Sequence, residues 1–185
     1  VIAARGEAAS QKDIEDAIAR LLKKDAGSAE TQQLPRSLAA AVQIEPDANL
    51  ALISVPGAYA AREARRALQL GLHVMLFSDN VSVEDEVALK EEAVERGLLM
   101  MGPDCGTAII NGKPLGFANV VCRGSIGIVG ASGTGIQEVT CGIHNLGSGV
   151  SQAIGTGGRD LSDAGGGRMT LMGIEALAAD PETRV

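Results

Sequence analysis

The stretch of sequence that decides the fold runs from Asn49 to Met101 and reads NLALISVPGAYAAREARRALQLGLHVMLFSDNVSVEDEVALKEEAVERGLLMM. Short, almost purely apolar runs alternate in it with longer amphipathic runs. Short apolar runs without polar alternation are typical of strands that are covered on both faces, whereas the longer runs have the spacing of helices. Because strands that alternate with helices are typical of a parallel sheet, the sequence predicts an α/β fold.

The strands and helices of this stretch can be assigned individually. Strands are expected at residues 50–55, 73–77 and 98–101. The helix between the first two strands carries its apolar face on Ala60, Ala64, Ala67 and Leu68. The next helix is expected to begin after a cap at Ser82, with Asp85 at its third position, and to end at Gly97. Its inward face is expected to hold Val83, Val87 and Val94.

The sequence that follows predicts a second α/β unit. A strand at 126–129 precedes a glycine-rich loop and a helix whose apolar positions are Ile136, Val139, Ile143 and Leu146. A strand at 150–154, a second glycine-rich loop at 155–160 and a helix at 170–179 come next. Between the two units, residues 105–123 offer only short apolar pieces among Gly, Pro and Asn, so we expect a linker there.

The predicted domains follow from these elements. The first domain is expected at residues 1–104, with a strand at 1–4, a helix around 14–21 and a poorly defined connection at 25–48. The second domain is expected to begin at residue 124 and to run to residue 185. The sequence opens without Met and stops just after a helical pattern, which predicts a piece of a longer protein.

Composition and charge narrow the classes of function. Only 2% of the 185 residues are aromatic, which nearly excludes a stacking platform for bases. The net charge of -7 removes the general attraction to nucleic acid and to anionic membranes. No apolar run approaches the roughly 20 residues of a membrane span, and the three cysteines lack metal-binding spacing. We therefore expect a cytoplasmic protein with an anionic small-molecule ligand and without nucleic-acid, membrane or metal partners.

Residues 130–135, GASGTG, form the strongest candidate for an anion site. They lie between a predicted strand and a predicted helix, where free backbone N–H groups and the helix dipole favour a negative charge. Ser132 and Thr134 add hydroxyl groups. The spacing of the glycines fits neither the Walker A motif nor the dinucleotide-binding motif. A tight turn that requires glycine explains the same residues, so both interpretations stay open.

Three other polar positions each allow two interpretations. Arg159 could bind a carboxylate or phosphate, or form an exposed salt bridge to Asp160 or Asp163. Residues 78–80 lie at the carboxyl edge of the first predicted sheet, where ligands bind in open α/β sheets, but they also suit a turn before a helix. Cys105 has no candidate base beside it, so a buried thiol is expected rather than a nucleophile.

Four motifs in order resemble the α subunit of succinyl-CoA synthetase and, more closely, FdrA-type proteins related to it. Residues 102–106, GPDCG, resemble the family's GPNCPG loop, and residues 125–134, SIGIVGASGT, resemble GxIGIVSRSGTL. Residues 154–160, IGTGGRD, look like VGIGGDP, and residues 180–183, DPET, look like DPxT. The FdrA branch is favoured by FSDNV at 77–81.

The resemblance implies a Rossmann-like CoA-binding domain followed by the first part of a flavodoxin-like parallel α/β domain. In the synthetases, the CoA thiol captures an acyl phosphate that is formed through a phosphohistidine. The positions that match the CoA contacts are Phe77, Ser78 and Asp79. The positions that match catalytic residues are Ser132, Gly133, Thr134 and Asp104, and those near the substrate are Gln137, Gly157 and Gly158. A nucleotide and Mg would come only through a β-type partner, in a homo- or hetero-oligomer.

Several departures from the family pattern bear on activity. The first phosphate loop, rich in glycine in the synthetases, reads ARGEAAS at residues 4–10. Asp104 stands where the family has Asn, and Gln137 stands where it has Tyr. Neither His73 nor His144 matches the phosphorylated histidine, so we expect the chain alone to be inactive.

Three functions therefore stay open. The first is a fragment of an acyl-CoA synthetase, a ligase that binds CoA and an acyl phosphate. The second is an FdrA-type subunit of a carbamoyltransferase in oxamate or allantoin degradation, which would use carbamoyl phosphate without CoA. The third is a non-catalytic ligand-binding or assembly module.

Overall fold

A computed structural model describes residues 34–185 of the protein. In chain order its elements are α2 (Leu38–Ile44), β1 (Leu50–Ile53), α3 (Gly57–Gln69), β2 (His73–Leu76), α4 (Val83–Arg96), β3 (Met100–Met101), β4 (Thr107–Ile110), β5 (Lys113–Gly116), β6 (Arg123–Gly130), α5 (Gly133–Asn145), β7 (Val150–Gly155) and α6 (Arg168–Ala179). The strand predicted at 1–4 and the helix predicted around 14–21 lie outside the described residues. The described part of the connection predicted at 25–48 holds the short helix α2.

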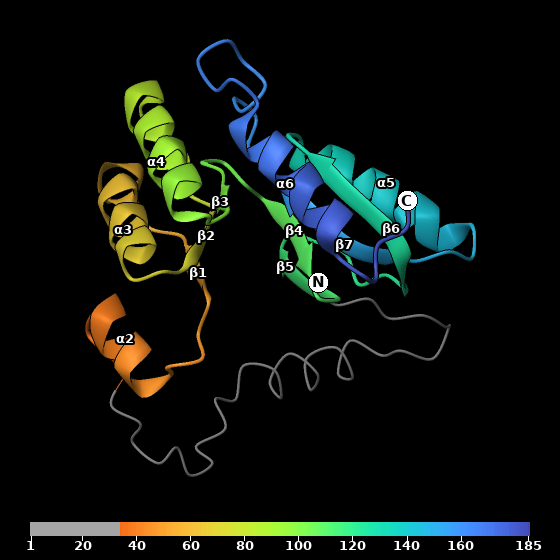
Figure 1. The fold of residues 1–185 in the computed structure, drawn as a ribbon, viewed down its shortest axis with the longest axis horizontal. Coiled ribbons are helices and arrows are strands. Elements are labelled where there is room, and N and C mark those ends of the chain that lie inside the picture. Colours follow the sequence, from red (N-terminus) through yellow and green to blue (C-terminus); the bar gives the residue numbers. More distant parts are fainter. Residues whose placement is uncertain (1–33) are drawn as a thin grey trace, which may run out of the picture. The chain divides into compact units, whose positions relative to one another are not determined.

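The first sheet is parallel, with the strand order β1-β2-β3. Leu50 pairs with His73, and Val74 pairs with Met100, so the three strands predicted in this stretch are confirmed, each over a shorter range. The helices α3 and α4 lie side by side against this sheet (Figure 1). The apolar face predicted for α3 is also confirmed, because Ala60, Ala64, Ala67 and Leu68 have no exposed surface.

Helix α4 begins and ends where the sequence predicts but turns a different face inward. Ser82 caps it by accepting a hydrogen bond from the Asp85 N–H, and Gly97 ends it with a φ of 67°. The predicted inward face is wrong, since Val83 and Val94 are 40% and 45% exposed. The buried positions are Glu86, Leu89, Lys90 and Ala93. The inward face is rotated because its two charged residues find partners in the loop after β7.

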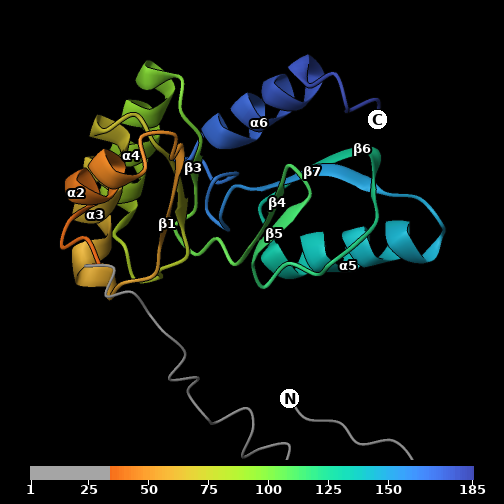
Figure 2. The same cartoon turned by 90° about the horizontal axis from the view of Figure 1, so that it is seen from below.

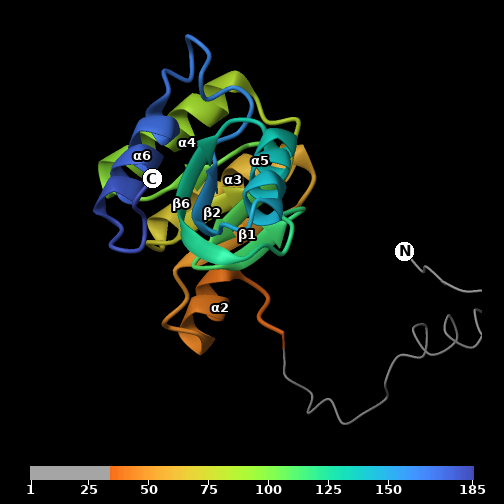
Figure 3. The same cartoon turned by 90° about the vertical axis from the view of Figure 1, so that its right-hand side faces the viewer.

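The second sheet has the strand order β5-β4-β7-β6. Strands β6 and β7 are parallel, as predicted, and Ile128 pairs with Ala153. Strand β4 runs antiparallel to both β5 and β7. Figure 2 shows α5 and α6 on opposite faces of this sheet, and Figure 3 shows them on either side of β6. The second unit is therefore a mixed sheet between two helical layers.

The segment 105–123, expected to be a linker, holds a β-hairpin. Strands β4 and β5 are joined at Asn111 and Gly112, which have φ values of 50° and 72°. Consecutive positive φ values suit the twist of a two-residue hairpin turn, and Asn-Gly is the favoured sequence for it. Both strands belong to the second sheet.

Helix α5 buries less of its predicted apolar face than expected. Ile136 is 2% exposed, whereas Val139 and Leu146 are 51% and 88% exposed. The second buried position is Thr140, whose hydroxyl donates to the Gln137 carbonyl 3.0 Å away. A polar side chain can occupy this position because its hydrogen bond stays within the helix.

Helix α6 joins the two sheets. Met169, at its start, packs into the core formed by the first sheet with α3 and α4, and the Met100 N–H lies 3.2 Å from the Met169 sulfur. In the segment that follows the helix, the Val185 carbonyl accepts a hydrogen bond from the Gly127 N–H of β6. Among residues 34–185, no helix is both long enough and apolar enough to cross a membrane.

Candidate functional site

A cavity of about 750 Å³ lies where the parallel strands end. It is lined by residues that follow β1, β2, β3, β6 and β7, and by the start of α5. The carboxyl ends of parallel strands are where open α/β sheets bind ligands. Nine of the ten site residues predicted from the sequence line it: Phe77, Ser78, Asp79, Asp104, Ser132, Gly133, Thr134, Gln137 and Gly158. The structure thus brings together residues from 77 to 158 in one hollow.

The N-terminus of α5 forms one wall of the cavity. Ser132 is its N-cap, and its hydroxyl oxygen accepts a hydrogen bond from the Gly135 N–H at 3.1 Å. Its own hydroxyl hydrogen can still be donated, to Thr134 at 3.3 Å or to a ligand. The backbone N–H groups of Gly133 and Thr134 donate to no acceptor within the described part of the chain. This wall can therefore offer several donors to an anion.

Gln137, one turn further along α5, is held in place by the β4–β5 hairpin. Its amide nitrogen donates to the Thr107 hydroxyl at 3.1 Å and to the Phe117 carbonyl at 2.9 Å. A Cβ atom on Gly133 would lie 3.2 Å from the same Thr107 hydroxyl. Both Thr107 and Phe117 line the cavity, and neither was predicted from the sequence. The hairpin that supplies them lies in the expected linker, which is why they were missed.

The loop after β2 also lines the cavity. The Ser78 hydroxyl donates to the Val55 carbonyl at 2.5 Å and accepts from the Val55 N–H at 3.0 Å. Ser78 is 7% exposed, so its side chain ties the ends of β1 and β2 together. The neighbouring Phe77 ring packs edge to face on Phe117, with centroids 5.1 Å apart. Phe77 and Asp79 therefore remain as the lining residues of this loop whose side chains are available to contact a ligand.

Two exposed carboxylates, Asp79 and Asp104, also line the cavity. Asp104 has a φ of 56°, a conformation that Asp and Asn adopt more readily than most residues. Its backbone N–H donates to the Ser78 carbonyl at 3.0 Å, which joins the loop after β3 to the loop after β2. These two residues add negative charge to the cavity that the donors of α5 also line.

The two glycines of the loop after β7 have different roles. Gly158 is exposed and lines the cavity, whereas Gly157 is buried. Gly157 has a φ of 86°, and a Cβ atom there would lie 2.5 Å from the Pro103 carbonyl oxygen. Gly157 therefore serves the close packing of two loops, and the structure does not place it on the cavity wall.

The remaining polar candidates lie outside the cavity. Arg159 forms neither predicted salt bridge, because its Nε atom pairs with Glu86 at 2.7 Å and a terminal nitrogen donates to the Val81 carbonyl. Cys105 is buried, and burial raises the pKa of its thiol to about 11. Burial lowers the pKa of His73, whose Nδ1 accepts a hydrogen bond from the Leu99 N–H. In residues 34–185, no group of three or more His, Cys, Asp or Glu side chains could hold a metal ion.

Comparison with known proteins finds several proteins of similar sequence. No family model matches the chain. It is 68% identical over 140 residues to the uncharacterized protein YahF of Escherichia coli K12, a match that covers 76% of this chain and 27% of YahF. It is 33% identical over 118 residues to subunit alpha 2 of the ADP-forming succinate–CoA ligase of Archaeoglobus fulgidus, covering 62% of this chain and 41% of that subunit. It is 32% identical over 145 residues to the corresponding alpha subunit of Aquifex aeolicus, covering 75% and 46%. The chain thus matches less than half the length of each of these relatives.

Solved structures show the same fold. An ATP citrate lyase from Methanothrix soehngenii, in complex with citrate and coenzyme A, matches with a TM-score of 0.60 and 17% identity, over 66% of this chain and 22% of the lyase. A dinucleotide-forming acetyl-coenzyme A synthetase from Ca. Korarchaeum cryptofilum matches with a TM-score of 0.55 and 19% identity, over 73% and 30%. The predicted α/β fold class is confirmed by these neighbours. The chain is similar in sequence to parts of succinate–CoA ligase alpha subunits, and in fold to parts of an ATP citrate lyase and of an acetyl-coenzyme A synthetase.

Proposed function

We propose that this chain is the CoA-binding and acyl-phosphate-binding part of an ADP-forming acyl-CoA ligase. The observation that supports this most directly is the cavity itself. It is lined both by the start of α5, whose first two N–H groups have no acceptor within residues 34–185, and by the loop after β2. These are the two segments whose sequences resemble the phosphate-facing and CoA-contacting segments of the synthetases. The succinate–CoA ligase relatives support the same ligand class.

In this proposal the phosphate group binds at the N-terminus of α5. The N–H groups of Gly133 and Thr134 and the hydroxyl of Ser132 donate to its oxygens, while the helix dipole favours its charge. Donors fixed in advance stabilise charge that develops during transfer of the acyl group, because they need no reorganisation when the reaction occurs. Gln137, held by Thr107, borders the acyl group.

The CoA moiety binds along the loop after β2. Phe77 supplies an apolar surface and Asp79 an acceptor for hydroxyl or amino groups, while Ser78 maintains the loop through Val55. The acyl phosphate itself is formed elsewhere in the complex. A β-type partner subunit is proposed to bring the nucleotide and Mg, in a soluble cytoplasmic assembly.

Calorimetric titration of the 185-residue chain with CoA, and separately with carbamoyl phosphate, tests the proposal. The test variant is Ser132→Ala with Gly133→Ala, which removes a hydroxyl donor and crowds the N–H groups against Thr107. We expect the affinity for carbamoyl phosphate to fall about tenfold or more. Ser82→Ala is the matched control. Ser82 caps α4 with a hydrogen bond of the same 3.1 Å length, but it does not line the cavity.

The control separates the effect of losing a helix cap from the effect of losing contacts with the ligand. Ser82→Ala is expected to lower stability by about 1 kcal/mol and to leave both affinities unchanged. If the wild type and the Ser132→Ala, Gly133→Ala variant bind carbamoyl phosphate with equal affinity, the loop is a structural turn and not an anion-binding site. Absence of binding to both ligands by the wild type would contradict the proposal and favour a non-catalytic assembly module.

A second function, that of an FdrA-type carbamoyltransferase subunit, is favoured by the acidic residues of the cavity. Asp79 and Asp104 place two carboxylates in the cavity that the donors of α5 also line. They would repel CoA, with its three phosphate groups, more strongly than carbamoyl phosphate, and they can accept hydrogen bonds from the NH₂ group of carbamoyl phosphate. Binding of carbamoyl phosphate without CoA in the same titration would select this function, and saturable CoA binding would select the ligase.

A further inference from the structure

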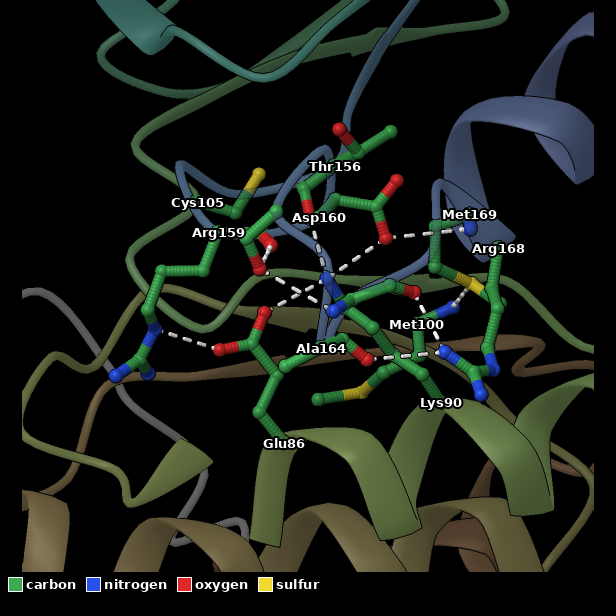
Figure 4. Close-up of polar contacts among 12 residues, drawn as sticks. Glu86, Lys90, Met100, Cys105, Thr156, Arg159, Asp160, Ala164, Arg168 and Met169 are labelled. Atoms are coloured by element: carbon green, nitrogen blue, oxygen red, sulfur yellow. Dashed lines mark hydrogen bonds and ion pairs between the residues drawn. The ribbon is translucent and has the colours of Figure 1, made fainter. Parts of the chain in front are cut away.

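A cluster of four charged side chains lies between α4 and the loop after β7. It consists of Glu86 and Lys90 from α4 and of Arg159 and Asp160 from the loop (Figure 4). The side chains of Lys90 and Asp160 have no exposed surface, and that of Glu86 is 3% exposed. Arg159, 44% exposed, covers Glu86 from the solvent side. The two positive and two negative charges balance within the cluster.

Lys90 is at the centre of this cluster. Its ammonium lies 2.8 Å from Glu86, 2.9 Å from Asp160 and 3.1 Å from the Thr156 carbonyl oxygen. A lysine ammonium has three donors, so every one of them is used. A buried ammonium is costly unless it is paired and hydrogen-bonded in this way, which leaves little freedom to the groups that it contacts.

The acceptors of Lys90 fix both ends of a short segment on the cavity wall. Thr156 precedes Gly157 and Gly158, and Asp160 follows them. The Thr156 carbonyl also accepts from the Gly102 N–H, and the Asp160 carboxylate accepts from the Thr170 N–H at 2.9 Å and the Thr170 hydroxyl at 2.7 Å. The backbone that presents Gly158 to the cavity is thus held from α4, from the loop after β3 and from α6.

We propose that Lys90 is a positioning residue for the ligand site. It makes no contact with the cavity, but it holds residues 156–160 in the conformation that places Gly158 on the cavity wall. The inference rests on the proposed function insofar as it concerns ligand affinity. It also has a purely structural consequence, because removing Lys90 releases the Thr156 carbonyl and the Asp160 carboxylate together.

The test uses two variants of the full 185-residue chain. Lys90→Met keeps an unbranched side chain and removes all three hydrogen bonds. Asp160→Asn removes the charge opposite Lys90 but keeps an oxygen that can accept from Thr170. Each is titrated with CoA and with carbamoyl phosphate, and the backbone amides of Gly157 and Gly158 are followed by ¹⁵N NMR.

Glu91→Gln is the matched control. Glu91 also reaches from α4 to α6, through an ion pair with Arg168 at 2.9 Å, but it is 53% exposed and contacts none of residues 156–160. Both test variants are expected to weaken binding of whichever ligand the wild type binds by about tenfold, which corresponds to the loss of about one hydrogen bond to the displaced wall. They should also shift the Gly157 and Gly158 amides. The control should leave affinity within about twofold, as expected for an exposed ion pair.

The outcomes distinguish this inference from the proposed function. A lower melting temperature with unchanged affinity and unmoved glycine amides would show that Lys90 is merely structural and would overturn the inference. If Lys90→Met does not fold, Asp160→Asn decides alone by the same two measurements. If the wild type binds neither ligand, the proposed function fails. The inference then depends on the amide resonances of Gly157 and Gly158. They shift in the variants if Lys90 positions the loop, and unchanged resonances would overturn the inference.

Discussion

At the scale of single residues, Asp160 shows how one carboxylate organises a site from outside it. It pairs with Lys90 of α4 and accepts hydrogen bonds from the Met169 and Thr170 N–H groups at the start of α6. A negative charge at a helix N-terminus is favourable because it meets the positive end of the helix dipole. Asp160 therefore acts as a remote cap for α6, whose own N-cap, Gly167, has no side chain to offer.

The titration of Asp160 gives a prediction about stability. Burial alone would raise the pKa of Asp160, but hydrogen bonds from Lys90 and Thr170 and the charge of Lys90 hold its pKa below the ordinary value. A carboxyl group with a depressed pKa stabilises the fold above its unfolded pKa, and this contribution is lost as the pH falls through the folded pKa. The free energy of unfolding should therefore fall more steeply for the wild type than for Asp160→Asn below about pH 4. Urea denaturation at stepped pH measures this, and equal slopes would refute it.

The sequence predicts the cavity residues better than it predicts this charged cluster. Glycines and polar residues that directly follow a predicted strand indicate a ligand site, because that edge of a parallel sheet is where ligands bind. For this reason Ser132, Gly133 and Asp79 could be predicted from their sequence neighbours alone. Lys90 and Asp160 are 70 positions apart, and nothing local to either residue indicates the other. Apolar spacing alone therefore placed Val83 and Val94 on the inward face of α4, where the structure has Glu86 and Lys90.

At the scale of elements, the β4–β5 hairpin shapes the site. It supplies Thr107 and Phe117, which hold Gln137 at the cavity. The hairpin itself depends on the turn at Asn111 and Gly112, where the backbone has positive φ values. The sequence contains this Asn-Gly pair between short apolar runs, which is a hairpin signal, so the strands could have been predicted had that signal been given more weight than the surrounding Gly and Pro.

Replacing Gly112 tests this dependence. Gly112→Ala should destabilise the fold by about 1 kcal/mol, because alanine is strained at a φ of 72° and its Cβ would lie 2.9 Å from an Arg123 nitrogen. Gly142→Ala is a useful contrast, since Gly142 lies inside α5 with nothing within 4 Å of a new Cβ. There alanine should stabilise by up to about 1 kcal/mol. Chemical denaturation compares the two, and opposite signs are the expected result.

At the scale of the whole described molecule, the two sheets share contacts that make independent unfolding costly. Met169 of α6 packs into the first core, and the cluster around Lys90 joins α4 to the loop of the second sheet. Separating the sheets would expose Met169 and leave buried charges unpaired, at a cost of about 3–5 kcal/mol for a broken buried pair. The domain boundaries predicted from the sequence, at 104 and 124, therefore need not be boundaries of cooperative folding.

Coincident unfolding transitions are the expected consequence. Tyr59 is the only tyrosine, the chain has no tryptophan, and Tyr59 lies on α3 beside the first sheet. Its fluorescence therefore reports on that part alone, whereas far-ultraviolet circular dichroism reports on all helices. Both signals should give one urea midpoint, as in two-state unfolding. Two separated midpoints would show that the sheets unfold independently.

The chain has two phenylalanines in all, Phe77 and Phe117, and they touch each other. One follows β2 and the other follows β5, and both line the cavity. Incorporating fluorinated phenylalanine would therefore produce two resonances with no background from the rest of the protein. Because the two rings pack edge to face, the resonances would change when the rings move relative to each other, and they would report on this part of the cavity lining even inside a much larger assembly.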